Sequence, residues 1–297
     1  MLDYKLLHAF SVVVDEQNFD KAASVLAITQ SAVSQRIKAL EQAIGQPVLV
    51  RAQPLTATVI GKKLLAHYQQ VKLLEQDILP DISGDNKLET IRANIASNAD
   101  SLATWLIGAI GDVCHQYNVA VNFRLADENR TIKYLKDGEV FGAISTYEHA
   151  LPGCTFDKLG DMHYILVAAP SFVKKYFPDG IDAQSLERAP AVTYDQKDDM
   201  HSKYIEQTFN FKEGSYPCHT VRSSEAFVGF AKQGLAYCLI PKLQIQAELH
   251  AGELIDLMPE SPLTRTLYWH HWVLLKGVFK AFSKAIVSRA QFALNNQ

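Results

Sequence analysis

The segment TQSAVSQRIKALE, residues 29–41, combines an apolar stripe with an unusual polar one. Val33, Ile37 and Leu40 recur at helical spacing, which predicts a helix with one buried face. The opposite stripe carries short hydroxyls, amides and an ammonium group: Gln30, Ser31, Ser34, Gln35 and Lys38. A solvated helix face is usually rich in Glu and Lys, which are good helix formers. This face is instead suited to donating and accepting hydrogen bonds.

Base edges in the major groove of DNA are the partners that such side chains fit. Glutamine can bond adenine at two positions, and serine can bond a base or the backbone. Arg36, next to this face, and Lys38 can reach phosphates or guanine. Arg51, farther along the chain, is expected on or next to the same surface. The predicted DNA-contacting set is Gln30, Ser31, Ser34, Gln35, Arg36, Lys38 and Arg51. The alternative is an ordinary solvated face in a helical bundle.

A second set of polar residues occurs where predicted strands end or helices begin. Helix starts offer N–H groups and hydroxyls that could hold a carboxylate. The segments concerned contain Ser97, Asn98, Asp100 and Ser101, then Ser145 and Thr146, and finally Ser223, Ser224 and Glu225. They predict a small-molecule site in a cleft between two α/β lobes, at the carboxyl ends of the strands.

Residue patterns for catalysis or metal binding are weak. The chain has no GxSxG, HExxH or phosphate-binding glycine loop. His270 and His271 are adjacent in a predicted strand, so they should point to opposite faces and cannot share a metal. Trp269 and Trp272 beside them are expected in the core, and His201 after two aspartates is a poor metal motif. We therefore expect no enzyme activity, no metal and no cofactor.

The predicted reading helix needs a small helical domain to position it. Helices are expected near residues 4–16 and after Asn18, and Thr29 is expected to cap the third. Two short helices joined by about three residues form a helix-turn-helix. The segment QPVLVRAQPLTATV that follows Gly45 predicts a two-stranded wing. Residues 1–60 are therefore predicted to be a winged helix-turn-helix domain.

A linker helix is predicted next, over about residues 61–79. Its apolar residues recur roughly every seven positions and predict a seam for another helix. The expected dimerisation residues are Leu64, Tyr68, Val71, Leu74 and Ile78. This helix could instead pack on its own domain. Pro80 and the polar residues after it indicate a hinge, so 61–88 is assigned as linker.

Alternating strands and helices follow from residue 89 to 297, which predicts parallel sheets wrapped by helices. This segment is long for a single α/β lobe, so two lobes are expected. The chain should leave the first lobe near Ala168 and return near Tyr268. Lobe I would comprise 89–167 and 268–297, and lobe II 168–267.

Composition places the chain among globular proteins with full cores. Apolar residues make up 48% of its 297 residues and charged residues 21%. No apolar run is long enough to cross a bilayer, and the first residues do not read as a signal peptide. The four cysteines are scattered, as expected for reduced thiols. A cytoplasmic location without membrane contact is therefore expected.

The stretch FDKAASVLAITQSAVSQRIKALEQAIGQPVLVR resembles the N-terminal signature of LysR-type transcriptional regulators, and the resemblance extends over the full chain. It implies a winged helix-turn-helix, a linker helix and a two-lobed effector domain similar to periplasmic solute-binding proteins. The segments SNADSLATWL, DDMH, PCHTVRSSEAF and GELIDL resemble the chromosome-initiation-inhibitor branch. That likeness implies a regulator that senses lysine or arginine and controls genes for basic-amino-acid export and metabolism.

A basic amino-acid ligand requires anions. The candidates are Asp100, Asp127, Glu128, Asp195 and Glu225, and the specific hypothesis is that at least one of Asp100, Asp127 and Glu225 bonds it. Acidic residues at helix starts are also ordinary caps, so each has an equally plausible structural role.

Two features of the N-terminal domain bear on DNA affinity. Many members of the family have a second wing arginine, whereas AQPLTAT after Arg51 has none, so Lys62 and Lys63 could replace it. Residues 1–60 hold five basic and five acidic side chains. Since phosphate neutralisation dominates DNA affinity, we expect modest affinity per domain and a strong dependence on salt and on assembly.

The sequence as a whole predicts a DNA-binding transcriptional regulator that forms a homodimer, or a homotetramer, and responds to L-lysine or L-arginine. Double-stranded DNA, the effector, a second copy and RNA polymerase are the candidate partners. The rivals are a related regulator with a different effector, a solute-binding module without DNA function, and an enzyme that uses the cleft.

Overall fold

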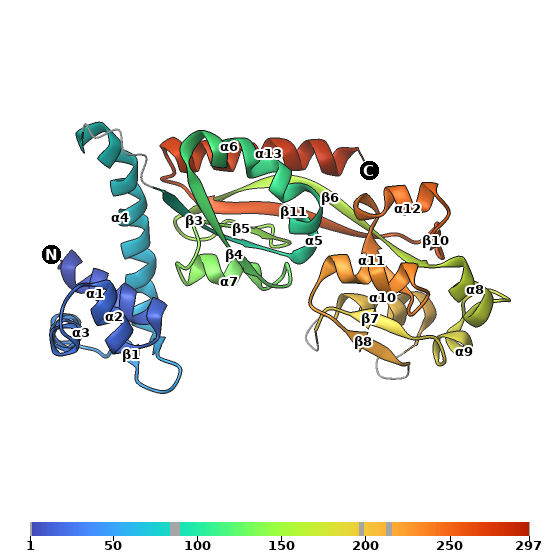
Figure 1. Ribbon diagram of the computed structural model, residues 1–297, viewed down its shortest axis with the longest axis horizontal. Coiled ribbons are helices and arrows are strands. Elements are labelled where there is room, and N and C mark those ends of the chain that lie inside the picture. Colours follow the sequence, from blue (N-terminus) through green and yellow to red (C-terminus); the bar gives the residue numbers. More distant parts are fainter. Residues whose placement is uncertain (1, 84–89, 196–198, 212–215, 297) are drawn as a thin grey trace.

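The computed structural model describes residues 2–83, 90–195, 199–211 and 216–296, with the side chains of 76–83 left out of the description. Figure 1 shows a small helical N-terminal domain, a long helix leading away from it, and an elongated C-terminal part built of two lobes. Within the described residues, none of the helices combines the length and the apolar character needed to span a bilayer.

The N-terminal domain consists of α1 (Tyr4–Glu16), α2 (Phe19–Val25), α3 (Gln30–Ile44) and a wing of β1 (Leu49–Val50) and β2 (Thr56–Ala57). Asn18 opens α2 by accepting hydrogen bonds from two backbone N–H groups. The Thr29 hydroxyl accepts from the N–H of Ala32 at 3.2 Å and opens α3, as predicted. Gly45 ends α3 with φ +74°, a conformation that favours glycine.

The predicted apolar stripe of α3 is confirmed. Val33, Ile37 and Leu40 are buried in one cluster with Leu7 and Phe10 of α1. The remaining surface of α3 is thereby turned away from the domain's core.

Helix α4 (Val59–Ser83) begins inside this domain and then leaves it. Gly61 allows close packing there, because a Cβ at this position would lie 2.1 Å from the carbonyl oxygen of Val48. Leu64 and Tyr68 are buried in the domain's own core, and the Tyr68 hydroxyl lies 2.8 Å from Nδ1 of His8. Their assignment to a dimerisation seam is therefore wrong: the alternative, packing on their own domain, holds for these two residues.

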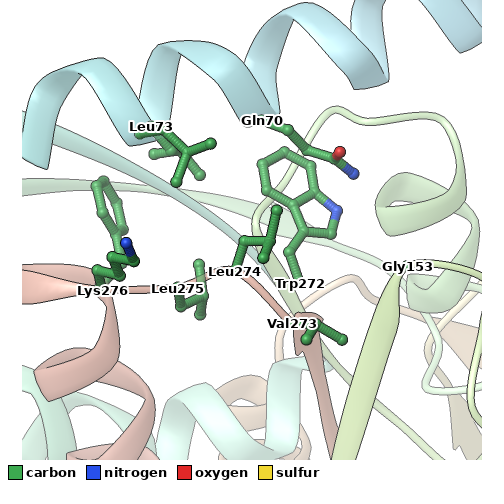
Figure 2. A pocket seen from close by; sticks show the side chains of 10 residues that line it. Gln70, Leu73, Gly153, Trp272, Val273, Leu274, Leu275 and Lys276 are labelled. Carbon is green, nitrogen blue, oxygen red and sulfur yellow. The ribbon is translucent and has the colours of Figure 1, made fainter.

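The later part of the predicted seam has a different environment. Val71 and Leu74 are half-buried, and Leu74 lines an apolar groove between α4 and the C-terminal domain. Figure 2 shows Gln70 and Leu73 of α4 facing the chain that runs from Trp272 to Lys276. The side chain of Ile78 lies outside the described residues.

Helix α4 also contacts lobe I closer to its start. Nζ of Lys62 pairs with a carboxylate oxygen of Asp137 at 2.5 Å. A Cβ on Gly138 would lie 2.2 Å from Cα of Ala66, so the two backbones approach closely. The start of α4, which packs on the N-terminal domain, is thus in direct contact with lobe I of the same protomer.

Lobe I is built on the parallel strands β4 (Val119–Leu125), β3 (Ile91–Ser97) and β5 (Gly142–Ser145), in that spatial order. One face carries α6 (Ile107–Tyr117) beside α13 (Gly277–Asn295), and α7 (Thr131–Lys136) packs on β5. The helical turn α5 (Ala99–Ser101) and the π-helical segment η1 (Leu102–Leu106) lead into α6.

Two long antiparallel strands, β6 (Cys154–Ala168) and β11 (Leu263–Trp272), extend the sheet and continue into lobe II. The pairing shifts register between Leu267 and Tyr268, close to the predicted return point. The predicted parallel pairing therefore holds for only part of the sheet, because β6 also pairs antiparallel with β9 (Cys238–Pro241) and β10 (Ile255–Asp256).

Lobe II completes the fold with β7 (Ala191–Thr193) and β8 (Cys218–Thr220), which are parallel. Its helical elements are α8 (Pro170–Tyr176), α9 (Ala183–Leu186), α10 (Met200–Phe209), α11 (Ser224–Lys232), the 3-10 turn η2 (Lys242–Gln244) and α12 (Gln246–His250).

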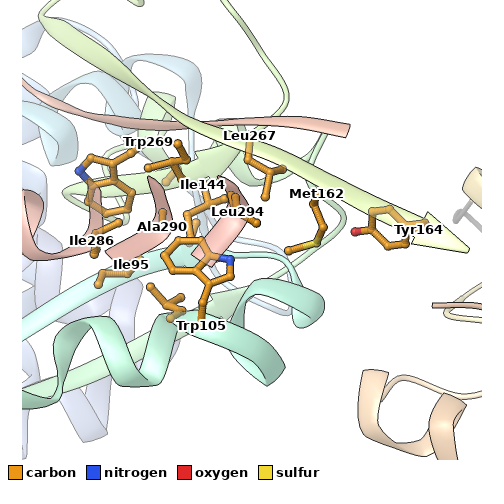
Figure 3. Close-up of a cluster of buried hydrophobic side chains, with 14 of the residues drawn as sticks. Ile95, Trp105, Ile144, Met162, Tyr164, Leu267, Trp269, Ile286, Ala290 and Leu294 are labelled. Atoms are coloured by element: carbon orange, nitrogen blue, oxygen red, sulfur yellow. The ribbon is translucent and has the colours of Figure 1, made fainter. Parts of the chain in front are cut away.

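The largest apolar core lies under α6 and α13 and reaches along β6 toward lobe II (Figure 3). Trp269 is fully buried and donates its indole N–H to the hydroxyl of Ser283 at 2.7 Å. Gly142 makes room for it, since a Cβ there would lie 2.2 Å from the indole ring. Trp272 is also buried, so both tryptophans are core residues as predicted.

Candidate DNA-reading face and effector cleft

The polar face of α3 is free of contact with the core. Gln30, Ser31, Gln35 and Lys38 are exposed, while Ser34 and Arg36 are half-buried. Side-chain contacts on this face are local: Nε2 of Gln30 lies 3.4 Å from the Ser34 hydroxyl, and the hydroxyl of Ser31 lies 3.0 Å from that of Thr29. The short side chains are therefore accessible to the base edges and phosphates of a DNA groove.

The wing supplies one exposed arginine, Arg51, whose guanidinium lies 3.4 Å from a carboxylate oxygen of Glu41 on α3. This exposed ion pair contributes little stability. The suggestion that Lys62 and Lys63 together replace a second wing arginine is only partly compatible with the structure. Lys62 is paired with Asp137 of lobe I, whereas Lys63 is exposed.

A cavity opens between the lobes at the carboxyl ends of β3 and β4. Lobe I contributes the residues that follow these strands, and lobe II contributes side chains from α10, α11 and the strands behind them. The lining consists of Asn98, Ala99, Asp100, Ala126, Asp127, Glu128, Tyr194, Met200, Ser224, Phe227 and Leu239. The empty space between these side chains is about 470 Å³, including the solvent at its open mouth.

Asp100 connects the two lobes. One carboxylate oxygen accepts from the Tyr164 hydroxyl at 2.7 Å, and the other accepts from the Ser224 hydroxyl at 2.6 Å. Burial raises the pKa of Asp100, and these two hydrogen bonds oppose that shift. Ser224 also lies 2.9 Å from Oε1 of Gln244, so the carboxylate is held by a short polar network.

Glu128 is a buried acid in the cleft wall. Burial, followed by the neighbouring charge of Asp127, raises its pKa to about 8. Arg265 of β11 lies 4.0 Å from Oε1 of Glu128, and its positive charge lowers this pKa by less than burial and Asp127 raise it. Together with Asp100 and Asp127, this acid makes the cavity suited to a cation.

Asn98 is a polar residue of the cleft with unused hydrogen-bonding capacity. It is 2% exposed, and neither its amide nitrogen nor its amide oxygen has a partner among the described residues. It precedes the helical stretch that starts at Ala99, yet its side chain makes no cap. Buried polar groups are normally paired, so this side chain is available to a ligand.

The predicted effector residues are only partly brought together. Asn98, Asp100 and Asp127 line the cavity, whereas Ser97, Ser101, Ser145, Thr146, Ser223 and Glu225 do not. The buried hydroxyls of Ser97 and Ser145 donate to backbone carbonyls, of Asn98 and Glu128, so their roles are structural. Ser101 is buried.

The other three residues hold local structure beside the cavity. Thr146 donates to the side chain of Asn129 at 2.6 Å. Ser223 caps α11, and its hydroxyl donates to the exposed carboxylate of Glu225. Glu225 affects the cavity only through its charge, which contributes to the raised pKa of Asp100.

The sequence missed several lining residues. Ser224 is the one residue of the predicted segment Ser223, Ser224 and Glu225 that lines the cavity. Tyr164, which bonds Asp100, lies inside an apolar strand where nothing indicates its role. Tyr194, Met200 and Phe227 come from separate elements of lobe II. Asp195 is neutralised by its own chain: it lies 3.4 Å from Arg130 and 3.8 Å from Arg222.

The histidines singled out in the sequence have separate structural surroundings. His270 is buried and contacts the Tyr147 carbonyl, while His271 lies 3.3 Å from Asp157 across the strand pair. His201 is buried, and burial lowers its pKa to about 4. Within the residues described, no group of three or more His, Cys, Asp or Glu side chains could hold a metal ion.

These features define a class of protein: a ligand-responsive regulator with a winged helix-turn-helix and a two-lobed effector domain. Two family models match the chain. The bacterial regulatory helix-turn-helix, lysR family, matches residues 4–62, and the LysR substrate binding domain matches residues 89–288. The chain belongs to the LysR family of DNA-binding transcriptional regulators.

Similar proteins carry the name ArgP. The chain is 50% identical to the HTH-type transcriptional regulator ArgP of Aeromonas salmonicida, over 99% of this chain and 98% of that one. Among solved structures, it is 32% identical to ArgP from Mycobacterium tuberculosis, with a TM-score of 0.84 and 98% of each chain covered. It is 31% identical to LysG from Corynebacterium glutamicum with bound effector Arg, with a TM-score of 0.78 and coverage of 97% and 98%. The sequence-based likeness to this branch is confirmed.

Proposed function

We propose that the effector of this regulator is L-lysine or L-arginine, bound in the cleft between the lobes. The observation that carries this proposal is the composition of the cavity: three carboxyl groups, from Asp100, Asp127 and Glu128, next to the unpartnered amide of Asn98. The N–H groups at the helix start after Asn98 can hold an α-carboxylate. The acids can then hold the two cationic ends of a basic amino acid.

The similarity to ArgP regulators and to an arginine-bound LysG supports the same ligand class. The genes under control are proposed to be those for basic-amino-acid export or metabolism. The chain acts as a regulator and not as an enzyme, and it works in the cytoplasm without a cofactor.

DNA contact is proposed to occur through Gln30, Ser31, Ser34, Gln35, Arg36 and Lys38 of α3 and Arg51 of the wing. The exposure of this face supports the assignment. A homodimer or homotetramer places several such faces on one DNA segment, which multiplies modest contacts. Val71 and Leu74 of α4 are the remaining candidates for its helix-to-helix contact.

Ligand binding shifts the protein between two arrangements by its differential affinity for them. Asp100 of lobe I bonds Ser224 of lobe II, so a ligand that engages Asp100 alters the contact between the lobes. Lobe I in turn touches α4 through Asp137 and Gly138. A change of lobe arrangement can therefore reach the reading helices.

Isothermal titration calorimetry on the full chain tests the ligand assignment. We expect L-lysine or L-arginine to bind saturably, with one molecule per chain, and L-leucine to bind at least tenfold more weakly because it lacks the second cation. The absence of binding by both basic amino acids would contradict the proposal.

A further inference from the structure

Glu128 is fixed in the cleft wall through its backbone. Its carbonyl oxygen accepts from the hydroxyls of Ser145, at 2.9 Å, and Thr131, at 3.1 Å. The side chain of Glu128 is only 6% exposed. The backbone of Glu128 is therefore held in place at the cavity wall, and its carboxyl group has little water to stabilise a charge.

The charged and titratable groups around this carboxyl come from four places. Asp127 precedes it, Asp100 follows the neighbouring strand, Tyr164 lies on β6, and Arg265 lies on β11. Among the described cavity-lining residues, those from lobe II are uncharged, and Arg130 and Arg222 are directed to Asp195. Arg265, 4.0 Å from Oε1 of Glu128, is thus a distant counterion in a cavity that holds three carboxyl groups.

The protonation state of Glu128 follows from this environment. Because burial raises its pKa to about 8, the carboxyl is mostly protonated at pH 7 when no further cation lies beside it. A cation in direct contact favours the ionised form. A bound guanidinium or ammonium group should therefore displace the proton.

We propose that Glu128 recognises the distal cation of the amino-acid ligand and releases its proton to the solvent as that cation binds. This inference rests on the proposed function and adds a residue and a proton balance to it. The α-carboxylate and α-ammonium groups share one carbon, so they bind together at Asn98 and Asp100. The distal cation is then left for the two acids that follow the neighbouring strand β4, Asp127 and Glu128. Asp127 is half-buried and already accepts from the backbone N–H of Asn129, whereas Glu128 is the buried acid of the two.

The proton balance gives a definite pH dependence. The pKa of Glu128 is raised, so below about pH 8 the free protein holds the proton that the complex lacks. Affinity should therefore rise with pH, by up to about tenfold per unit between pH 6 and 7, and level off above pH 8. Citrulline has the same α groups as arginine but a neutral side chain, so it should lack this dependence.

Calorimetry in two buffers of different ionisation enthalpy measures the protons released. At pH 7 we expect about one proton per arginine bound and close to none for citrulline, which should bind at least tenfold more weakly. Glu128→Gln should bind arginine at least tenfold more weakly and release almost no protons. Glu187→Gln, at an exposed position of lobe II, is the matched control and should behave as the parent chain does.

The outcomes separate this inference from the proposed function. Arginine binding to the parent chain without proton release, or with release unchanged in Glu128→Gln, overturns the role of Glu128 and leaves the ligand assignment intact. Failure of lysine and arginine to bind at all overturns both. If Glu128→Gln does not fold, the comparison of arginine with citrulline on the parent chain decides alone.

Discussion

Replacing Ser34 and Gln35 together with alanine is expected to weaken binding to the operator by about 30-fold or more. Each lost base contact costs about 1–3 kcal/mol, and the two costs roughly add. Binding to unrelated DNA should change little, because phosphate contacts dominate it. The fold should persist, since the core contacts of α3 come from Val33, Ile37 and Leu40.

Fluorescence anisotropy with operator and scrambled duplexes at several salt concentrations measures both effects. Gln42→Ala is the matched control, because Gln42 is exposed on α3 but lies about two turns beyond Gln35, near the end of the helix. Residues near the start of a reading helix contact the bases, so we expect this control to bind like the parent chain. If the double variant kept its preference for the operator, α3 would not be the reading element. Parent-chain binding that did not fall steeply with salt would contradict the expected reliance on phosphate contacts.

Asp100→Asn is expected to lower the affinity for arginine by about 30-fold or more. Removing one partner of a buried charge pair costs about 2–5 kcal/mol, since the other charge is left unpaired. Asparagine keeps the size of the side chain and one acceptor oxygen for Tyr164 or Ser224. The loss should therefore come from the missing charge and not from a collapsed site.

Calorimetry on the variant and on Asp112→Asn separates these causes. Asp112 is exposed on α6, in the same helical stretch, and its replacement should leave binding unchanged. Thermal unfolding followed by circular dichroism checks that both variants fold. Unchanged arginine affinity in a folded Asp100→Asn chain would exclude Asp100 from the site.

The N-terminal domain was largely predictable because its determinants are local. Capping by Asn18 and Thr29 and the stripe of Val33, Ile37 and Leu40 depend on residues a few positions apart. The partner of an apolar helix face is a different matter. The spacing of Leu64 and Tyr68 fits a dimer seam, yet both are buried against α1 of the same chain. The spacing of residues along a helix does not indicate which other helix lies next to it.

The sequence predicted the position of the cleft but only some of the residues that line it. The rule that ligands lie at the carboxyl ends of strands located Asn98, Asp100 and Asp127 correctly at the cavity. The rule does not indicate which hydroxyls face the cavity. It therefore also selects Ser97 and Ser145, whose hydroxyls donate to backbone carbonyls instead. Tyr164 reaches Asp100 only because β6 continues from lobe I into lobe II. That continuity is a property of the tertiary fold.

A basic amino acid bound in the cleft is expected to change how α3 binds DNA. DNase I footprinting on the DNA upstream of the gene for this protein, with and without arginine or lysine, measures this change. We expect a protected region whose extent or affinity changes with the amino acid, and no change with the Asp100→Asn chain. A footprint that is identical with and without both amino acids, at concentrations that saturate the cleft, would contradict the account.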